Sequence, residues 1–234
     1  MAIYKKSAYC KNCEDCNRKS DLFQLLSPDE IQIMNDDRFE VHFKAGENIA
    51  KQGTNITHII SLTSGMAKIF IEGINDRNLL LSLIGPNTII SGPGVFTDLR
   101  NHFSITALET TTVCFINLDN FKKVINLNPT FTLKYLELIN LQQSIFFEKI
   151  VSLTQKQMHG KIADALIYLS EKIYKSFDFE LTLSRQDLAD MTAMSKDSAI
   201  RILKELEKDG IILINGRRIS IPGMEALKEI SAKG

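Results

Sequence analysis

The spacing of apolar residues changes once along this chain, at Pro129, and the change limits which folds the chain can adopt. Before it, from Phe39 to about Leu118, short apolar runs alternate with glycines. After it, apolar residues recur at spacings of three and four for more than twenty residues. The first pattern is typical of an all-β sandwich or barrel and the second of a long helix. The sequence therefore predicts an α+β protein with a β-domain ahead of its helices.

The segment before the β-region carries a helix start, and the β-region itself shows alternation. In "SPDEIQIM", Ser27 is a predicted N-cap, Pro28 the first helical residue and Glu30 a first-turn acid. In "FEVHF" (39–43), Phe39, Val41 and Phe43 face one way, as in a half-buried strand. The glycines that separate the strand-like runs are Gly46, Gly53, Gly65, Gly73 and Gly85.

The helical segment has the pattern of a coiled-coil seam with one polar member. The seam consists of Leu136, Ile139, Gln143, Phe146, Ile150 and Leu153. Leu138, Leu141 and Ile145 lie beside the seam and give the helix a second apolar surface. One surface can pack on the β-domain and the other on a second copy of the chain. The seam thus favours a homodimer, and the alternative is a core helix in a monomer.

The C-terminal third reads as helix, tight turn, helix and two-stranded hairpin. Ser184 and Asp187 resemble a capping box, Ser195 can cap the second helix, and Gly210 can end it. The Asn215-Gly216 pair predicts a two-residue hairpin turn. A helix-turn-helix with a hairpin is a winged helix, whose second helix enters the major groove of DNA.

Local charge does not decide whether this segment binds DNA, because residues 182–209 hold five basic and six acidic side chains. The placement of polar residues does favour binding. Lys196, Asp197, Ser198 and Arg201 stand at the exposed start of the second helix, within reach of base edges. Arg217 and Arg218 stand at the tip of the wing, where phosphates would lie. The alternative is a small helical bundle without affinity for DNA.

Three of the four cysteines lie in "YCKNCEDC", at Cys10, Cys13 and Cys16, and the fourth is Cys114. A C-x2-C-x2-C run can hold three corners of a four-iron, four-sulfur (4Fe–4S) cluster if a fourth thiolate comes from elsewhere. Four cysteines also suit a structural zinc site. Redox-active thiols, or no metal at all, remain open. The four histidines, His42, His58, His102 and His159, are scattered along the chain.

Net charge does not indicate a function, so the functional argument depends on the motifs described above. The formal net charge is zero, with 28 basic and 28 acidic residues, so it gives no argument for nucleic acid. The sequence has neither a signal-peptide pattern nor an apolar run of transmembrane length, which predicts a cytoplasmic protein with no membrane partner. It also has no glycine-rich phosphate loop and no nucleophile elbow, so we expect no enzymatic activity.

A β-rich module, a long helix and a winged helix, in this order, resemble the Crp/Fnr family of bacterial transcription regulators. The segments that carry the resemblance are "FKAGENIAKQG", "HIISLTSGMAKIFI", "LSLIGPNTIISG" and "LSRQDLADMTAMSKDSAIRILKELEKDGII". The resemblance implies an N-terminal β-roll of the cupin-like, cyclic-nucleotide-binding type, a dimerisation helix and a C-terminal winged helix-turn-helix. The expected divisions are an arm (1–26), the β-roll (27–128), the helix (129–155) and the DNA-binding domain (156–234).

Within the family, the chain looks closer to the oxygen-sensing FNR branch than to the cyclic-nucleotide binders. Those binders hold the nucleotide with a Gly-Glu pair and an Arg-Ser pair. Here Ser91-Gly92-Pro93-Gly94 has no glutamate, and Phe103 precedes Ser104 where the arginine would stand, so cyclic AMP is unlikely as the effector. By contrast, "ALETTTVCFI" (107–116) resembles the FNR segment that carries its distal ligand, at the position of Cys114. The third N-terminal cysteine lies nearer to the second than in FNR.

The resemblance also implies partners and a mechanism. A cluster held by Cys10, Cys13, Cys16 and Cys114 would favour a homodimer bound to pseudo-palindromic double-stranded DNA. Oxygen or nitric oxide would degrade this cluster. RNA polymerase would be a further partner. The expected DNA-binding residues are Ser184, Arg185, Ser195, Lys196, Asp197, Ser198, Ile200, Arg201, Arg217 and Arg218. The serious alternative is a regulator of this fold that senses haem or another small ligand. A pure interaction protein would bind no DNA.

Overall fold

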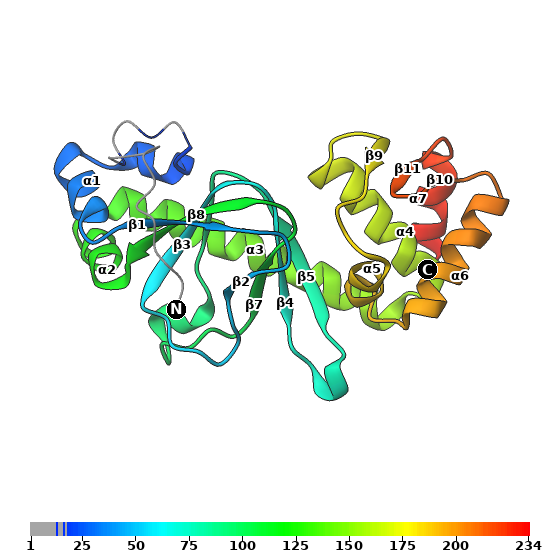
Figure 1. Cartoon of the computed structure of the whole chain (residues 1–234), viewed down its shortest axis with the longest axis horizontal. Helices are drawn as coiled ribbons and strands as arrows, with labels where there is room; N and C mark the ends of the chain where they lie inside the picture. The colour runs from blue at the N-terminus through cyan, green and yellow to red at the C-terminus, as the bar shows by residue number, and fades with distance from the viewer. Residues whose placement is uncertain (1–12, 14–15, 17) are drawn as a thin grey trace. The chain divides into compact units, whose positions relative to one another are not determined.

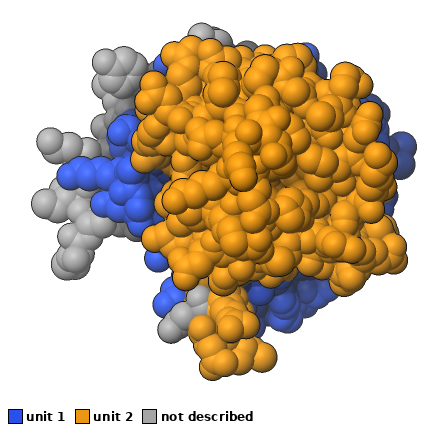
Figure 2. Space-filling model, turned by 90° about the vertical axis from the view of Figure 1, so that its right-hand side faces the viewer, with its two compact units in different colours: residues 1–71, 83–142 blue, residues 72–82, 143–234 orange. Residues whose placement is uncertain are grey.

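The structure is a computed structural model that describes Cys13, Cys16 and residues 18–234 (Figure 1). The described residues form two compact units, which Figure 2 colours separately. One unit holds the described residues up to Ile71 together with Leu83–Gln142, and the other holds Glu72–Ser82 together with Gln143–Gly234. Within the described part of the chain, no helix is long and apolar enough to cross a membrane.

Two four-stranded sheets form the β-roll, in the orders β1-β8-β3-β6 and β2-β7-β4-β5 (Figure 1). The strands are β1 (Phe39–Phe43), β2 (Asn48–Ala50), β3 (His58–Ser64), β4 (Ala67–Ile71), β5 (Leu79–Ile84), β6 (Thr88–Ile90), β7 (Ser104–Ala107) and β8 (Thr111–Asn117). Strand β8 pairs antiparallel with both β1 and β3, so it lies in the interior of its sheet. The predicted α+β class with an N-terminal β-roll is confirmed.

Short helices precede the first strand of the roll, follow its last strand and lie in two of its strand connections. They are η1 (Asp21–Leu25), α1 (Pro28–Asn35), η2 (Ile74–Asp76), η3 (Pro93–Phe96) and α2 (Leu118–Leu127). Helix α1 starts with the predicted Ser27 cap, and Glu30 completes a capping box with it. Phe23, Met34 and Phe121 are fully or almost fully buried in one apolar cluster, and Cys13 lies in the same cluster.

Helix α3 runs from Pro129 to Gln155 and is the longest element of the chain. At its start, Phe131 and Tyr135 are buried in the same apolar cluster as Phe121. Farther along the helix, most side chains are exposed or half-buried. The fully buried side chains of the helix therefore lie in its first two turns, and Ile139 of the next turn packs against the same cluster.

The C-terminal part is a winged helix-turn-helix, as the sequence predicts. Its elements are α4 (Met158–Tyr168), a π-helical turn η4 (Leu169–Ile173), β9 (Asp178–Glu180), α5 (Arg185–Met191), α6 (Lys196–Lys208), β10 (Leu213–Asn215), β11 (Arg218–Ser220) and α7 (Met224–Lys233). Ser184 and Asp187 form the predicted capping box of α5, and the Ser195 hydroxyl accepts a hydrogen bond from the Ser198 amide at the start of α6. Gly210 follows α6 with a left-handed φ of +71°.

The wing differs from the predicted two-stranded hairpin in two ways. Strand β9 pairs with β11 and makes the sheet three-stranded. The turn is also shifted by one residue, because Asn215 pairs with Arg218 and leaves Gly216 and Arg217 as the loop. Gly216 has the left-handed φ of +61° that such a turn requires. The main chain of Arg217 accepts a hydrogen bond from the Leu181 amide, and this bond fixes the shifted turn.

Candidate functional site

Cys114 lies in the middle of β8, opposite Glu40 of β1 and Ser61 of β3. Its thiol is buried, with 5% of the residue exposed. The Arg38 guanidinium, directly before β1, donates a hydrogen bond from Nη1 to the Cys114 sulfur over 3.1 Å. Glu40 Oε2 accepts from the same thiol over 3.8 Å. The register of two strands therefore places a cationic donor and a carboxylate at one thiol.

The arm reaches the same place through Asn35 and Arg38. The Cys13 amide donates to Asn35 Oδ1 over 3.2 Å, and Arg38 Nε donates to the same oxygen over 3.2 Å. Cys13 and Cys16 are both buried, with 7% of each residue exposed. Asn35 thus joins the arm to the arginine that contacts Cys114.

Burial raises the pKa of the Cys114 thiol to about 12, although the charge of Arg38 lowers it. Burial also raises the pKa of Cys13, again against Arg38, and the neighbouring thiol of Cys16 adds to the rise. The charge of Cys13 likewise raises the pKa of Cys114. These thiols need a further positive charge to become thiolates, and a bound metal centre supplies such a charge.

The donor chemistry fits a sulfur-ligated metal centre, although only part of the expected ligand set can be placed. Cys13, Cys16 and Cys114 are free thiols. No group of three or more metal-ligating side chains is close enough to hold an ion among Cys13, Cys16 and residues 18–234. Cys10, the fourth expected ligand, lies outside the described residues.

The residues that align with the two nucleotide-binding pairs of the cyclic-nucleotide branch make contacts with other parts of this chain. The Ser104 hydroxyl accepts a hydrogen bond from the Gln52 amide over 2.9 Å. The Phe103 ring lies so close to Gly92 that an added Cβ there would be 3.3 Å from it. Ser91 accepts a hydrogen bond from the Tyr135 hydroxyl over 2.8 Å. Phe103 gives this place an apolar ring where the cyclic-nucleotide branch has a guanidinium.

Helix α6 presents its first two turns to solvent. Lys196, Asp197 and Arg201 are exposed, whereas Ser198 and Ile200 are half-buried. The side chains of Asp197, Ile200 and Arg201 line a shallow groove on this face. Residues of the opposite face, Ala199, Ile202, Leu203 and Leu206, are buried. The helix thus separates a polar outer face from an apolar inner face.

Arg201 is held by a carboxylate that the sequence did not single out. Its Nη1 lies 2.7 Å from Glu205 Oε1, and His159 Nε2 lies 2.7 Å from Glu205 Oε2. The hydrogen bond from His159, followed by that from Arg201, lowers the pKa of the Glu205 carboxyl. An exposed ion pair of this kind contributes little to stability, so Arg201 can leave it at small cost.

The two expected wing arginines, and Arg185 at the start of α5, all have partners within the domain. Arg217 donates to the main-chain oxygens of Leu181 and Thr182 over 3.0 and 2.7 Å. Both oxygens of Asp178 accept from Arg218, and this pairing lowers the pKa of Asp178 to about 2. Arg185 Nη2 donates to the Gly216 oxygen over 3.2 Å. The bonds of Arg217 and Arg185 fasten the wing to neighbouring parts of the domain, whereas the Arg218–Asp178 pair links two strands within the wing.

Helix α3 exposes a row of apolar side chains that differs in phase from the predicted seam. Ile139, Phe146 and Leu153 are half-buried, and Ile139 packs against the core of the β-roll. The exposed row is Leu133, Leu136, Asn140, Gln143, Phe147 and Ile150, at spacings of three and four. Leu133 and Phe147 are 69% and 65% exposed. Leu136, Gln143 and Ile150 belong to both rows.

Two residues at the cysteine site carry different amounts of sequence signal. Alternation in "FEVHF" puts Glu40 and His42 on the face opposite Phe39 and Phe43, so a polar partner on β1 could have been expected. Arg38 meets Cys114 across 76 positions of sequence, and no local pattern predicts such a pair.

The chain matches two family descriptions. One is a cyclic nucleotide-binding domain over residues 40–128, and the other is a Crp-like helix-turn-helix domain over residues 160–230. The chain is 21% identical to the transcriptional activator protein FnrL of Cereibacter sphaeroides, covering 93% of this chain and 90% of the relative. It is 22% identical to the fumarate and nitrate reduction regulatory protein of Escherichia coli K12, covering 94% and 90%.

Solved structures share the fold. FixK2 from Bradyrhizobium japonicum superposes with a TM-score of 0.73 at 16% identity, covering 82% of this chain and 96% of that one. The c-di-GMP responsive global regulator CLP of Xanthomonas campestris gives 0.73 at 18% identity, covering 83% and 99%.

Proposed function

The chain belongs to the Crp/Fnr family of DNA-binding transcription regulators, and we propose that α6 is the helix that enters the major groove of double-stranded DNA. The observation that carries this proposal is the polar outer face of α6, where Lys196, Asp197 and Arg201 are exposed. Proteins of this family are regulators and not enzymes. A regulator that acts on bacterial DNA and on RNA polymerase would work in the cytoplasm.

Three residues of α6 are proposed to read bases. Arg201 can give two hydrogen bonds to guanine, Asp197 can accept from the amino group of cytosine, and Ile200 can touch a thymine methyl group. Lys196 and Ser198 lie beside them on the first turn of α6, next to the cap Ser195. Ser184 and Arg185 start α5. We place the capping serines and Arg185 at phosphates, since amides at helix starts attract anions.

The wing would meet the DNA backbone through Arg218, while Arg217 keeps the wing in place. This division follows from their partners: Arg218 is paired with the exposed carboxylate of Asp178, which a phosphate can replace, whereas Arg217 is bound to two main-chain oxygens. Arg218→Ala should therefore weaken binding about equally for all sequences and reduce the salt dependence of binding by about one phosphate contact.

A direct test of the DNA proposal uses fluorescence anisotropy with genomic fragments from the region upstream of this protein's own gene. The wild-type protein should select fragments that contain an inverted repeat, and Asp197→Ala should change which base is preferred within it. Lys175→Ala, at an exposed turn away from α6, serves as the matched control. A wild-type protein that binds no fragment would refute the proposal.

We propose that α3 pairs with α3 of a second copy. The exposed row that includes Leu133, Leu136, Phe147 and Ile150 supports this, because a row of large apolar side chains at heptad spacing is stable only when covered. Asn140 and Gln143 would face each other near its centre and favour one register. The dimer would present two α6 helices to adjacent major grooves, which suits a pseudo-palindromic site.

We further propose that Cys10, Cys13, Cys16 and Cys114 hold a 4Fe–4S cluster, whose loss in oxygen or nitric oxide would be the regulatory signal. The buried free thiols of Cys13, Cys16 and Cys114 support this, as does the likeness to FnrL and to the fumarate and nitrate reduction regulator. When bound, the cluster supplies a redox-sensitive group that four thiolates retain. Arg38 donates to the Cys114 sulfur and offsets part of the negative charge there.

Metal analysis distinguishes this proposal from its chemical rival. Protein purified without oxygen should contain iron and acid-labile sulfide and absorb visible light, and Cys114→Ser should remove both. Ser61→Ala, a change on the strand that pairs with β8 opposite Cys114, is the matched control. A colourless protein with one zinc ion per chain would refute the cluster and favour structural zinc.

Cyclic AMP is not proposed as the effector, although residues 40–128 match a cyclic nucleotide-binding domain. A cyclic phosphate needs a cationic partner, and the Phe103 ring stands in that place, while Ser104 is engaged by the Gln52 amide. Calorimetric titration with cyclic AMP should therefore show no binding. Micromolar binding of cyclic AMP to the wild-type protein would overturn this view.

A further inference from the structure

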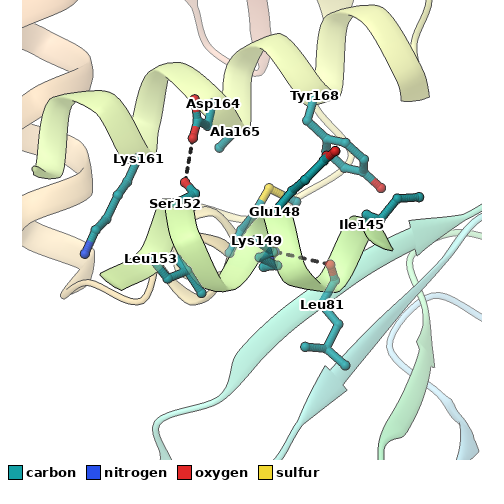
Figure 3. A pocket seen from close by; sticks show the side chains of 11 residues that line it. Leu81, Ile145, Glu148, Lys149, Ser152, Leu153, Lys161, Asp164, Ala165 and Tyr168 are labelled. Atoms are coloured by element: carbon teal, nitrogen blue, oxygen red, sulfur yellow. Dashed lines mark hydrogen bonds between the residues drawn. The ribbon is translucent and has the colours of Figure 1, made fainter. Parts of the chain in front are cut away.

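A cavity of about 190 Å³ lies within the compact unit that holds the winged helix, among β5, α3, α4 and the end of α5 (Figure 3). This volume is far above the ~10–15 Å³ that a single water occupies in a cavity. One side of the lining is apolar and consists of Leu81, Ile145, Leu153, Ala165 and Met191. Its lining includes neither a cysteine nor a residue of α6.

One of the two carboxylates at the cavity is already satisfied. Asp164 of α4 accepts hydrogen bonds from the hydroxyls of Ser152 and Ser231, each over 2.5 Å, and pairs with Lys156 over 2.8 Å. The second carboxylate belongs to Glu148, and its side chain runs toward Tyr168 in Figure 3. Neither carboxylate is therefore engaged with the lysine described next.

Lys149 of α3 reaches the cavity as a cation with too few partners. Its Nζ donates one hydrogen bond, to the Leu81 main-chain oxygen over 3.2 Å. It forms no ion pair within the described part of the chain, although an ammonium group has three donors. Burial alone lowers the pKa of Lys149 to about 8, and no neighbouring carboxylate opposes the shift. A half-buried ammonium without an anion is costly, and an anionic ligand would remove that cost.

We propose that this cavity binds a small organic monocarboxylate, with its carboxylate on Lys149 and its apolar body against Leu81, Ile145 and Met191. An inorganic anion fits this cavity less well than an organic one, because it would not contact the apolar side of the lining. The carboxylates of Glu148 and Asp164 at the lining disfavour a dianion such as phosphate. Lys149, which has no carboxylate partner, and the apolar wall therefore fit a single negative charge on an apolar body.

The cavity joins elements that take part in different steps of regulation. Lys149 and Ile145 belong to α3, which is proposed to pair the two copies, and Ala165 belongs to the first helix of the DNA-binding domain. A ligand that contacts both helices favours the arrangement in which both contacts are made. The site could thus set DNA affinity independently of the cysteines.

Nuclear magnetic resonance or calorimetric titration of the full-length wild-type protein tests the proposal with defined probes. Phenylacetate and hexanoate should bind, whereas phenylacetamide, which has the same body without the charge, should bind about 10- to 100-fold more weakly. Inorganic phosphate should bind no better than the amide. Equal binding of acid and amide, preference for phosphate, or no binding of either acid into the millimolar range would each overturn the proposal.

A pair of variants locates the contact. Lys149→Met keeps the length of the side chain and removes the charge, and it should weaken phenylacetate binding about 10- to 100-fold. Lys161→Met is the matched control, because Lys161 lines the same cavity and its side chain points away from Leu81 in Figure 3. A loss of binding in Lys161→Met with none in Lys149→Met would contradict the assignment. The comparison of probes on wild-type protein decides the question even if Lys149→Met fails to fold.

Discussion

At the scale of single residues, Arg38 is the side chain that the proposed cluster site depends on beyond its cysteines. It donates to the Cys114 sulfur over 3.1 Å and shares Asn35 with the Cys13 amide. Hydrogen bonds to ligand sulfurs and nearby charge set the reduction potential of an iron–sulfur cluster. Arg38 is therefore a positioning residue, and its effect is measurable on the cofactor itself.

Replacing Arg38 should change the midpoint potential of the cluster without removing the cluster. Arg38→Met takes away a positive charge and a sulfur hydrogen bond, so the midpoint potential should fall and the cluster absorbance should decay faster in air. Arg38→Lys should restore part of the potential. Redox titration followed by visible absorbance measures both, with Arg77→Met at an exposed turn as the control. An unchanged potential in Arg38→Met would deny the residue this role.

Replacing Arg201 should reduce the specificity of DNA binding at one base pair. Arg201→Ala should cost about 1–3 kcal/mol on the best site and relax specificity at a single position, because a bidentate contact to guanine is lost. Lys208→Ala, on the last turn of α6, should leave specificity unchanged. Anisotropy titrations against a set of single-base variants measure the difference. A uniform loss on every sequence would instead assign Arg201 to a phosphate.

Among single residues, those with local signals could be predicted and those with distant partners could not. The caps Ser27, Ser184 and Ser195 are confirmed, because a cap bonds to an amide two or three residues away. Glu205 could not be assigned to Arg201, since the exposed face of a helix offers several partners at similar spacing. The contact of Lys149 with the Leu81 main-chain oxygen likewise could not be predicted, because the two residues are distant in sequence and no local pattern marks Lys149.

At the scale of elements, the turn between α5 and α6 carries a measurable strain. Ala193 has a φ of +52°, in the left-handed region that favours glycine. A non-glycine residue there costs about 1–2 kcal/mol, partly offset by the lower backbone entropy of alanine in the unfolded chain.

Ala193→Gly should therefore stabilise the protein by about 0.5–1 kcal/mol. Ala226→Gly, at an exposed position inside α7, should destabilise it by about 1 kcal/mol, because glycine is the poorer helix former. Urea unfolding followed by circular dichroism measures the two changes. Loss of stability in both variants would show that the turn tolerates alanine without strain.

The exposed row on α3 predicts which substitutions break the dimer. Phe147→Lys should shift the protein to monomers, because Phe147 is 65% exposed in the single chain and belongs to the row that would be covered. Leu127→Lys, on the exposed end of α2, is the matched control at 61% exposure. Sedimentation analysis measures the mass. A dimer that survives Phe147→Lys but not Leu127→Lys would move the interface to another surface.

The elements differ in how far the sequence determines them. The change of period at Pro129 predicts the roll and the long helix, since both are amphipathic and locally patterned. The phase of the α3 seam is not set by the pattern alone, because Ile139 and Leu136 are equally apolar and only packing against the roll separates them. The third wing strand β9 has three residues and no turn signal that identifies it.

At the scale of the whole molecule, the account joins three proposals: a cluster at Cys10, Cys13, Cys16 and Cys114, a dimer through α3, and DNA recognition by α6. The order of β-roll, long helix and winged helix could be predicted from the sequence and is shared with FixK2. The link between the cluster and DNA affinity could not be predicted from any one segment, because it depends on a change of population between dimeric and monomeric states.

One titration tests that link most directly. Protein purified without oxygen is bound to a labelled fragment with an inverted repeat, and visible absorbance and fluorescence anisotropy are recorded on the same sample as air is admitted. The cluster absorbance and the bound fraction should fall together, and Cys114→Ser should start with neither. Equal DNA affinity before and after complete loss of the absorbance would contradict that link.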